Sequence, residues 1–334
     1  MIKSLIFKNF CLLIGIFSCL LAVTQTANAA SPSLGIDPPL TAINIIPPAI
    51  AVSPINIQNK DDSRITLRIQ IKPFKANGEN GELEYFNDSL EIFKNIQILD
   101  ANTPVETITL EPKQTKKLNL SISIQQDMGI SDYYFSIIFI STDIPLAEAS
   151  SSVNRIGIAT NVLLSIGPLE TPKVILEEFS SKLLLDKGPV SFVVRIRNLD
   201  THFIKPQGEI IIKNVFGQNV GKLNLTRTNI LSDSIRAIPN DIYMQELRSK
   251  ENPDKKTKNT YDFKHPVALW KENFLLGPYT ATLNISMSDE GPLFTKNIYF
   301  FAFPLQALAI LIAAIIAVVI ITRKLKRYAN KNRI

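Results

Sequence analysis

Apolar and polar residues alternate along most of the chain between Ser31 and Tyr299. The alternation is strictest over 65–72 and 118–125, and it returns over 192–197 and 281–286. Successive side chains of a β-strand point to opposite faces, so this pattern predicts strands with one buried and one solvated face. No helical stripe of about ten or more residues appears outside the two ends of the chain. The body is therefore predicted to be all-β.

This body is too long for one ordinary sandwich of about 100 residues. Residues 167–172 read GPLETP, and two prolines and a glycine in so short a stretch are typical of an interdomain linker. We predict two tandem immunoglobulin-like β-sandwiches, over 31–168 and 173–299, joined by a linker over 169–172.

Two tyrosines support the immunoglobulin-like assignment. Tyr133 and Tyr279 each stand at the head of a late strand shortly after a glycine, Gly129 and Gly277. Immunoglobulin-like sandwiches carry a corner tyrosine there, whose hydroxyl ties a turn to nearby backbone. Plain cross-strand packing is the alternative for both residues.

The N-terminus has the pattern of a secretory signal peptide over 1–29. Lys3 and Lys8 precede an apolar stretch, and Ala27-Asn28-Ala29 forms a small-residue site, with cleavage expected after Ala29. A loose lipobox ending at Cys19 offers lipidation as the alternative.

The C-terminus has the pattern of a membrane anchor. An apolar run, Pro304 to Thr322, precedes a basic tail over 323–334. Nineteen helical residues would rise about 28 Å, close to a bilayer core. The positive-inside rule then predicts a single-pass protein of the plasma membrane, with an extracellular ectodomain and a cytoplasmic C-terminus.

Charge and cysteine usage exclude some classes of protein. The chain carries 36 Lys and Arg against 30 Asp and Glu, but the leader and the tail hold eight of the basic residues and none of the acidic ones. The region between them is slightly acidic, so the composition argues against nucleic-acid binding. Both cysteines lie in the leader, and a disulfide-free ectodomain favours a bacterial surface protein.

The residues give no sign of an enzyme, a metal or a cofactor. His202 and His265 are far apart in polar surroundings, where exposed loop histidines are expected, and no catalytic or phosphate-binding motif is present. Trp270 is the only tryptophan, and an aromatic core residue is favoured for it over a ligand-stacking platform. No catalytic residue, metal ligand or cofactor site is predicted.

The segment Tyr133 to Ile140 reads YYFSIIFI and is apolar on both alternating faces. A sandwich buries only one face of a strand in its core, so something else must cover the other. Coverage from within the chain is the favoured interpretation; the alternative is a partner-binding surface, for which Tyr134 and Ile138, on one face, are the candidate residues. The polar loop 248–265 is the next candidate.

Two other segments have local signatures. Six prolines between Ser31 and Pro54 predict an extended edge segment along the first sandwich. Residues 211–225 read IIKNVFGQNVGKLNL and predict a hairpin turning at 217–219.

The layout resembles the WxL-interacting proteins of Gram-positive surfaces. The resemblance rests on LEPKQTKKLNL at 110–120, on Asp132-Tyr133-Tyr134, and on AIPND at 237–241 followed by GPY at 277–279. It implies a peptidoglycan-binding first domain, a second domain that binds host protein, and a membrane anchor. The first domain is also similar to the pilus-chaperone type of immunoglobulin fold. Phe135-Ser136 stand where the family has paired glycines.

These features together predict a membrane-anchored scaffold that binds cell-wall polymer or another surface protein. The alternative is a surface or periplasmic assembly factor that acts by β-strand complementation, favoured by the chaperone-like first domain and its proline-rich edge.

Overall fold

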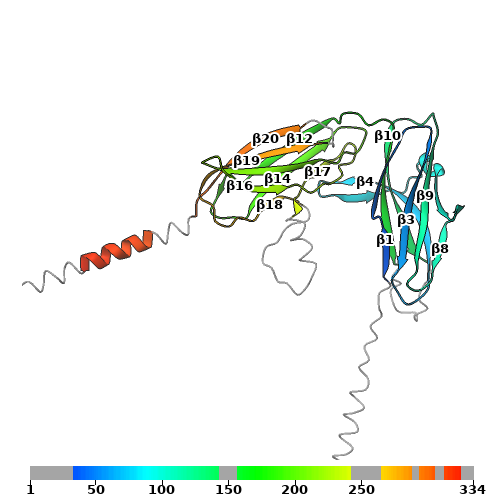
Figure 1. Ribbon diagram of the computed structural model, residues 1–334, viewed down its shortest axis with the longest axis horizontal. Coiled ribbons are helices and arrows are strands. Elements are labelled where there is room, and N and C mark those ends of the chain that lie inside the picture. The colour runs from blue at the N-terminus through cyan, green and yellow to red at the C-terminus, as the bar shows by residue number, and fades with distance from the viewer. Residues whose placement is uncertain (1–32, 143–155, 242–264, 288–292, 305–311, 325–334) are drawn as a thin grey trace, which may run out of the picture.

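The computed structural model describes residues 33–142, 156–241, 265–287, 293–304 and 312–324. Two β-sandwiches follow each other along the chain, domain 1 (34–166) and domain 2 (174–302), and their long axes stand at a wide angle (Figure 1). The predicted signal peptide, with Cys19 and the cleavage site at Ala29, lies outside the described residues. So does the polar loop 248–265, apart from His265.

Domain 1 consists of two sheets. Sheet I has the strand order β1-β3-β9-β6-β7, and sheet II has the order β2-β11-β10-β4-β5, with β8 also paired to β4. Their bounds are β1 Leu34–Asp37, β2 Leu40–Ile45, β3 Ala49–Asn59, β4 Ile65–Asn77, β5 Glu82–Tyr85, β6 Ile96–Asp100, β7 Thr103–Pro104, β8 Thr107–Leu110, β9 Thr115–Ile124, β10 Ser131–Ser141 and β11 Gly157–Ile166, with a 3-10 helix, η1, at Glu91–Asn95.

Domain 2 also consists of two sheets. Sheet III has the order β12-β14-β17, with β18 also paired to β14, and sheet IV has the order β13-β20-β19-β15-β16. Their bounds are β12 Val174–Ser181, β13 Leu184–Leu185, β14 Val190–Asn198, β15 Gln207–Asn214, β16 Asn219–Asn224, β17 Ile235–Ala237, β18 Ala268–Trp270, β19 Gly277–Ser286 and β20 Leu293–Ala302.

Each domain has a core of its own, formed by the inward faces of its strands. In domain 1 the odd-numbered residues of β10, Phe135, Ile137 and Phe139, are fully buried. In domain 2 the buried residues of β14, in sheet III, and of β15 and β19, in sheet IV, pack together in one core. The all-β sandwich architecture predicted from the alternation is confirmed.

The proline-rich N-terminal segment supplies one edge to each sheet of domain 1. β1 pairs with β3 at the edge of sheet I, and β2 pairs in parallel with β11 at the edge of sheet II. The chain crosses between the sheets at Pro38-Pro39, where no backbone N–H exists to join a ladder. In domain 2, β15 and β16 form the hairpin expected at 211–225, and Gly217 turns it with a φ of 76°.

The structure corrects the predicted membrane anchor over 304–322. In this region the structure describes helix over 312–324. Within the part of the chain that the structure describes, no helix combines the length and apolar character needed to cross a membrane. The predicted single-pass plasma-membrane localisation is therefore wrong, and the orientation inferred from the basic tail loses its basis.

Candidate functional site: the seam between the domains and an open strand edge

The surface where the two domains meet, called the seam below, is organised around Asp132. This residue begins the outer face of β10, and its side chain is only 1% exposed. One carboxylate oxygen lies 2.6 Å from Nδ1 of His202. The other accepts hydrogen bonds from the backbone N–H of Phe203 and from the hydroxyl of Tyr134, both at 2.6 Å. One carboxylate of domain 1 thus holds a loop of domain 2.

The loop that carries His202 is itself fixed by polar side chains. Asn198 is fully buried, and its amide nitrogen donates to the carbonyls of His202, Ile230 and Leu231. Asp200 accepts hydrogen bonds from the backbone N–H groups of Lys173 and His202, at 3.0 and 3.3 Å. Burial alone would raise the pKa of Asp200, but these hydrogen bonds outweigh it and lower the pKa below its ordinary value.

Tyr134 connects the Asp132 centre to the rest of the seam. Its hydroxyl accepts a hydrogen bond from the backbone N–H of Ser232 in domain 2, at 3.0 Å. Its ring stacks on Phe74, with ring centroids 6.2 Å apart. Burial raises the pKa of the Tyr134 hydroxyl far above its ordinary value, and the Asp132 carboxylate adds to the shift, so this hydroxyl stays protonated.

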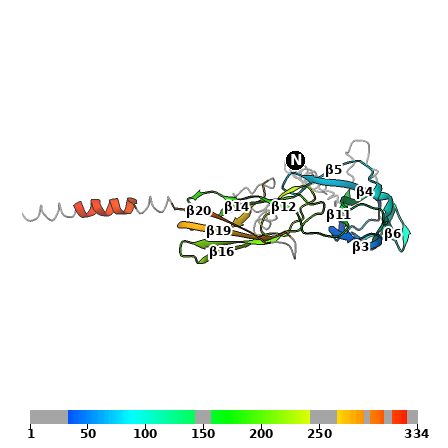
Figure 2. The same ribbon diagram turned by 90° about the horizontal axis from the view of Figure 1, so that it is seen from above.

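An apolar cluster and a docked hairpin complete the contact between the domains. Phe74 and Leu163 of domain 1 pack with Leu231 of domain 2. The turn between β4 and β5 reaches across to domain 2, as Figure 2 shows, and the carbonyl of Glu79 accepts a hydrogen bond from the N–H of Ala237 at 2.8 Å. The Glu79 carboxylate pairs with Arg195 at 3.2 Å. Polar and apolar contacts together fix the two domains in one arrangement.

Sheet II has an open edge beside the point where the N-terminal segment changes sheets. β10 pairs with all of β11, but β2 pairs only with Asn161–Ile166. The N–H of Ser141 donates to Ile156 and that of Asn161 donates to Pro39. Because backbone groups alternate in direction along a strand, the N–H and C=O of Gly157 and Ala159 point away from β10, into a lane that no described strand occupies.

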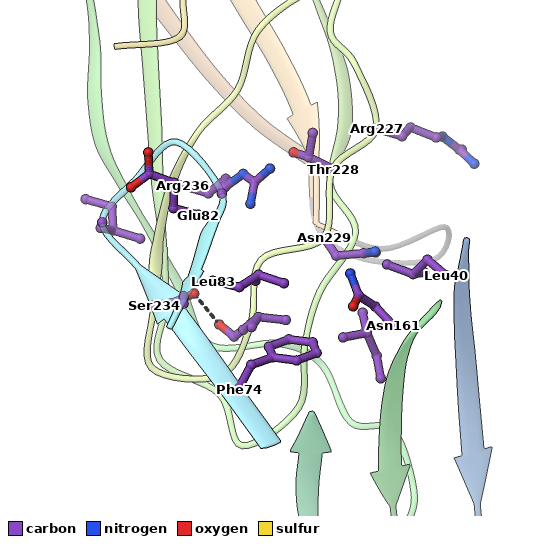
Figure 3. Close-up of a pocket in the computed structure, with 16 residues that line it drawn as sticks. Leu40, Phe74, Glu82, Leu83, Asn161, Arg227, Thr228, Asn229, Ser234 and Arg236 are labelled. Carbon is purple, nitrogen blue, oxygen red and sulfur yellow. Dashed lines mark hydrogen bonds between the residues drawn. The ribbon is translucent and has the colours of Figure 1, made fainter. Parts of the chain in front are cut away.

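Two cavities flank the seam, and Arg227 borders both. The larger, of about 340 Å³, is lined by β2, the linker and the 200–205 loop. Ser165 Oγ and His202 Nε2 reach it as buried atoms without a hydrogen-bond partner among the described residues. The smaller, of about 240 Å³, lies between the β4–β5 turn and residues 227–236 (Figure 3).

The residues singled out in the sequence fall into several environments. Tyr134 and Ile138 lie on the outer face of β10, but domain 2 covers Tyr134, whereas Ile138 is half-buried. Tyr133 packs against the core of domain 1. The Tyr279 hydroxyl accepts a hydrogen bond from the N–H of Leu276 at 3.1 Å, within its own turn.

Two further expectations concern Trp270 and the histidines. Trp270 is 8% exposed and packs edge-on against Tyr279 in the core of domain 2. His265 is exposed, as expected, but the expectation that His202 is an exposed loop residue is wrong: it is 6% exposed because Asp132 holds it in the seam. Among the described residues, no three His, Cys, Asp or Glu side chains are grouped as a metal ion would need.

Comparisons with known proteins give a weak likeness only. No family model and no curated protein matches the chain, so the resemblance to WxL-interacting proteins stays a prediction. Among solved structures, the class 5 fimbriae chaperone CfaA is similar over 79% of this chain and 98% of its own, with 12% identity and a TM-score of 0.39. The Salmonella enterica SafA pilin in complex with the SafB chaperone is similar over 80% of this chain and 96% of its own, with 9% identity and a TM-score of 0.35. The E. coli chaperone DraB is similar over 79% of this chain and 96% of its own, with 10% identity and a TM-score of 0.34. Likenesses of this size carry no argument about function.

Proposed function

We propose that this protein is an assembly factor that binds an extended segment of another surface protein by β-strand addition to β11. The observation that carries the proposal is that β11 pairs with β10 along its whole length but with β2 only over Asn161–Ile166. A strand of this length inside a sheet is normally paired on both sides, and free N–H and C=O groups in a row are a template for another strand.

The side chains around the lane define the segment that would fit. Ile36 of β1 and Ile158 of β11 border the lane and are only partly buried, although both pack against the core of domain 1. An added strand would cover them with its own inward-facing residues. Side chains alternate along a strand, so the partner segment needs an apolar residue at every second position. Each such side chain that becomes fully buried contributes about 1.5–3 kcal/mol.

The domains differ in what they offer to such a partner. Domain 1 supplies the lane, and the seam fixes domain 2 beside the same sheet, because Leu163 of β11 packs against Leu231. Scaffold binding of wall polymer, the function that the sequence favoured, receives no comparable support. Trp270, the residue that the sequence offered as a possible ligand-stacking platform, is a core residue.

Amide hydrogen exchange with a peptide set tests the proposal. The peptides would be about a dozen residues long, with alternating apolar residues, taken from surface proteins of the producing cell. A binding peptide is expected to slow exchange at Gly157 and Ala159. Ala159→Pro removes an outward N–H that β10 does not use and should abolish binding. Binding without slower exchange in β11 would refute strand addition there.

A matched variant on the neighbouring strand locates the lane. The N–H groups of Asn161 and Gly167 donate to Pro39 and Ile45, so the alternate residue Ala42 directs its N–H away from β11. Ala42→Pro therefore removes an equivalent outward N–H from β2 and should leave binding intact. If Ala42→Pro abolishes binding and Ala159→Pro does not, the partner adds to β2, and the proposed lane is wrong.

A further inference from the structure

Arg236 of β17 is half-buried, and its guanidinium has no charged partner among the described residues. Its Nε is buried without a hydrogen-bond partner, and no carboxylate among the described residues lies within ion-pair distance of it. Burial lowers the pKa of Arg236, and no neighbouring charge offsets this effect. A buried charge without a counter-ion is costly, and its removal from water needs compensation.

The nearby carboxylates do not supply that compensation. Glu79 and Glu178 both pair with Arg195, at 3.2 and 3.4 Å. Glu82 borders the same cavity as Arg236, but its side chain forms no ion pair within the described ranges. With the exposed Arg227, the cavity wall carries two guanidinium groups and one carboxylate.

Two uncharged polar side chains that line this cavity can donate hydrogen bonds into it. Thr228 Oγ1 is buried and has no hydrogen-bond partner in the part of the chain that the structure describes. Asn161 uses its amide oxygen to accept a hydrogen bond from Ser136 at 2.6 Å. Its amide nitrogen, which can only donate, faces the space between Leu40 and Asn229 (Figure 3). A cavity with a cation and several donors is complementary to an anion that accepts hydrogen bonds.

The turn between β4 and β5 leaves room for the guanidinium of Arg236. Gly81, at the turn between β4 and β5, has a φ of 90°, and a Cβ added there would collide with the guanidinium of Arg236. Gly78 lies in the same turn with a φ of 69°, but a Cβ added there meets nothing closer than 3.9 Å. The absence of a side chain at Gly81 is what lets Arg236 reach the cavity.

We propose that this cavity, between domain 1 and domain 2, binds a small oxyanion, a carboxylate or a phosphate. Arg236 neutralises its charge, and Thr228 and Asn161 donate hydrogen bonds to it. An arginine suits this role because its planar fork matches the oxygens of both groups. The volume of about 240 Å³ limits the ligand to a small molecule. Since the wall comes from both domains, the bound anion would strengthen the seam.

Thermal unfolding of the full chain tests the site with inorganic phosphate and acetate as probes, each compared with sodium chloride at equal ionic strength. At least one oxyanion is expected to raise Tm by a few degrees when present at about a hundred times its Kd, while chloride leaves Tm unchanged. A response to phosphate alone indicates a tetrahedral ligand, and a response to acetate alone indicates a carboxylate. If neither phosphate nor acetate raises Tm above its value in sodium chloride of the same ionic strength, at any concentration tested, the proposal is overturned.

Substitutions separate binding from folding. Arg236→Met keeps most of the apolar stem and removes the charge, so it should raise Tm without anion and abolish the oxyanion response. Gly81→Ala should also abolish the response because it displaces the guanidinium. Gly78→Ala carries the same positive-φ strain without the collision and should keep the response. An unchanged oxyanion response in Arg236→Met would overturn the assignment, as would a lower anion-free Tm in that variant.

Discussion

Among substitutions of single polar side chains in the seam, Asp132→Ala is expected to cause the largest loss in the free energy of unfolding of the two-domain protein. The substitution removes the acceptor of the Phe203 N–H and of His202 Nδ1, whereas the Tyr134 hydroxyl can rotate. Each buried donor left unpaired costs about 1–3 kcal/mol, so two of them predict a loss of about 3 kcal/mol. For a chain of this size that corresponds to a fall in Tm of about 6–12 °C.

The assay is urea unfolding of the full chain, with Asp100→Ala as the control. Asp100 pairs with Lys116 at the same distance of 2.6 Å, but its side chain is 31% exposed and both partners belong to domain 1. An exposed pair of this kind contributes at most about 1 kcal/mol. If Asp132→Ala costs no more than Asp100→Ala, then the Asp132 centre does not hold the domains together.

Three other outcomes follow from the same structure. Ile137→Asp places a charge in the core of domain 1 and should prevent cooperative folding, whereas Ile138→Asp, one residue further and half-buried, should change the free energy of unfolding by less than about 1 kcal/mol; equal losses in urea unfolding would contradict this. Because the folded pKa of Asp200 is depressed, its contribution to stability is fully present above its ordinary pKa of 3.8 and is lost as pH falls through the folded value. Asp200→Asn should therefore make the acid unfolding curve shallower below about pH 4, and an unchanged curve would oppose this. Fragments 31–168 and 171–303, the second of which keeps Phe300 and Ala302 of β20, should each melt cooperatively because each core is complete; a fragment without a cooperative transition would show that the seam belongs to a common core.

The strand content could be predicted because it depends on neighbouring residues. The alternation over 65–71 places Leu67 in the core, and the same rule predicts the buried face of β9 at Leu118 and Leu120. The prolines of the N-terminal segment likewise predicted its edge position, since proline cannot donate to a central ladder.

The seam could not be predicted in this way. Asp132 and His202 are 70 positions apart, and although Asp132 belongs to the short motif Asp132-Tyr133-Tyr134, nothing in the sequence connects it to His202. Tyr134 gave a partial signal, because the apolar outer face of β10 required a cover, but the sequence did not say which segment provides it. In the sequence, nothing distinguishes Arg236 from an arginine on a strand surface. The structure shows that Gly81 of the β4–β5 turn packs against its guanidinium. Contacts of this kind depend on the relative placement of two domains, which local sequence does not encode.

For the apolar C-terminal run, the sequence led to a wrong prediction. Hydropathy alone predicted a span over 304–322, whereas no helix among the described residues is both long and apolar enough to cross a membrane. A hydropathy window registers apolar composition and does not measure the length of a helix.

Disulfide trapping at β11 tests the central claim most directly. Both native cysteines precede residue 31, so Ala159→Cys introduces the only cysteine of the segment 31–334. Binding peptides from the exchange experiment would each carry one cysteine, moved along the sequence. Strand addition predicts efficient disulfide formation at one peptide position, the residue directly opposite residue 159. Trapping should be poor one residue away, because side chains alternate between faces, and weaker two residues away, where the diagonal distance is too long. The control, Val52→Cys, lies on β3 of the other sheet and is 60% exposed. Trapping that is equal at every peptide position, or equal at Val52→Cys and Ala159→Cys, would contradict strand addition.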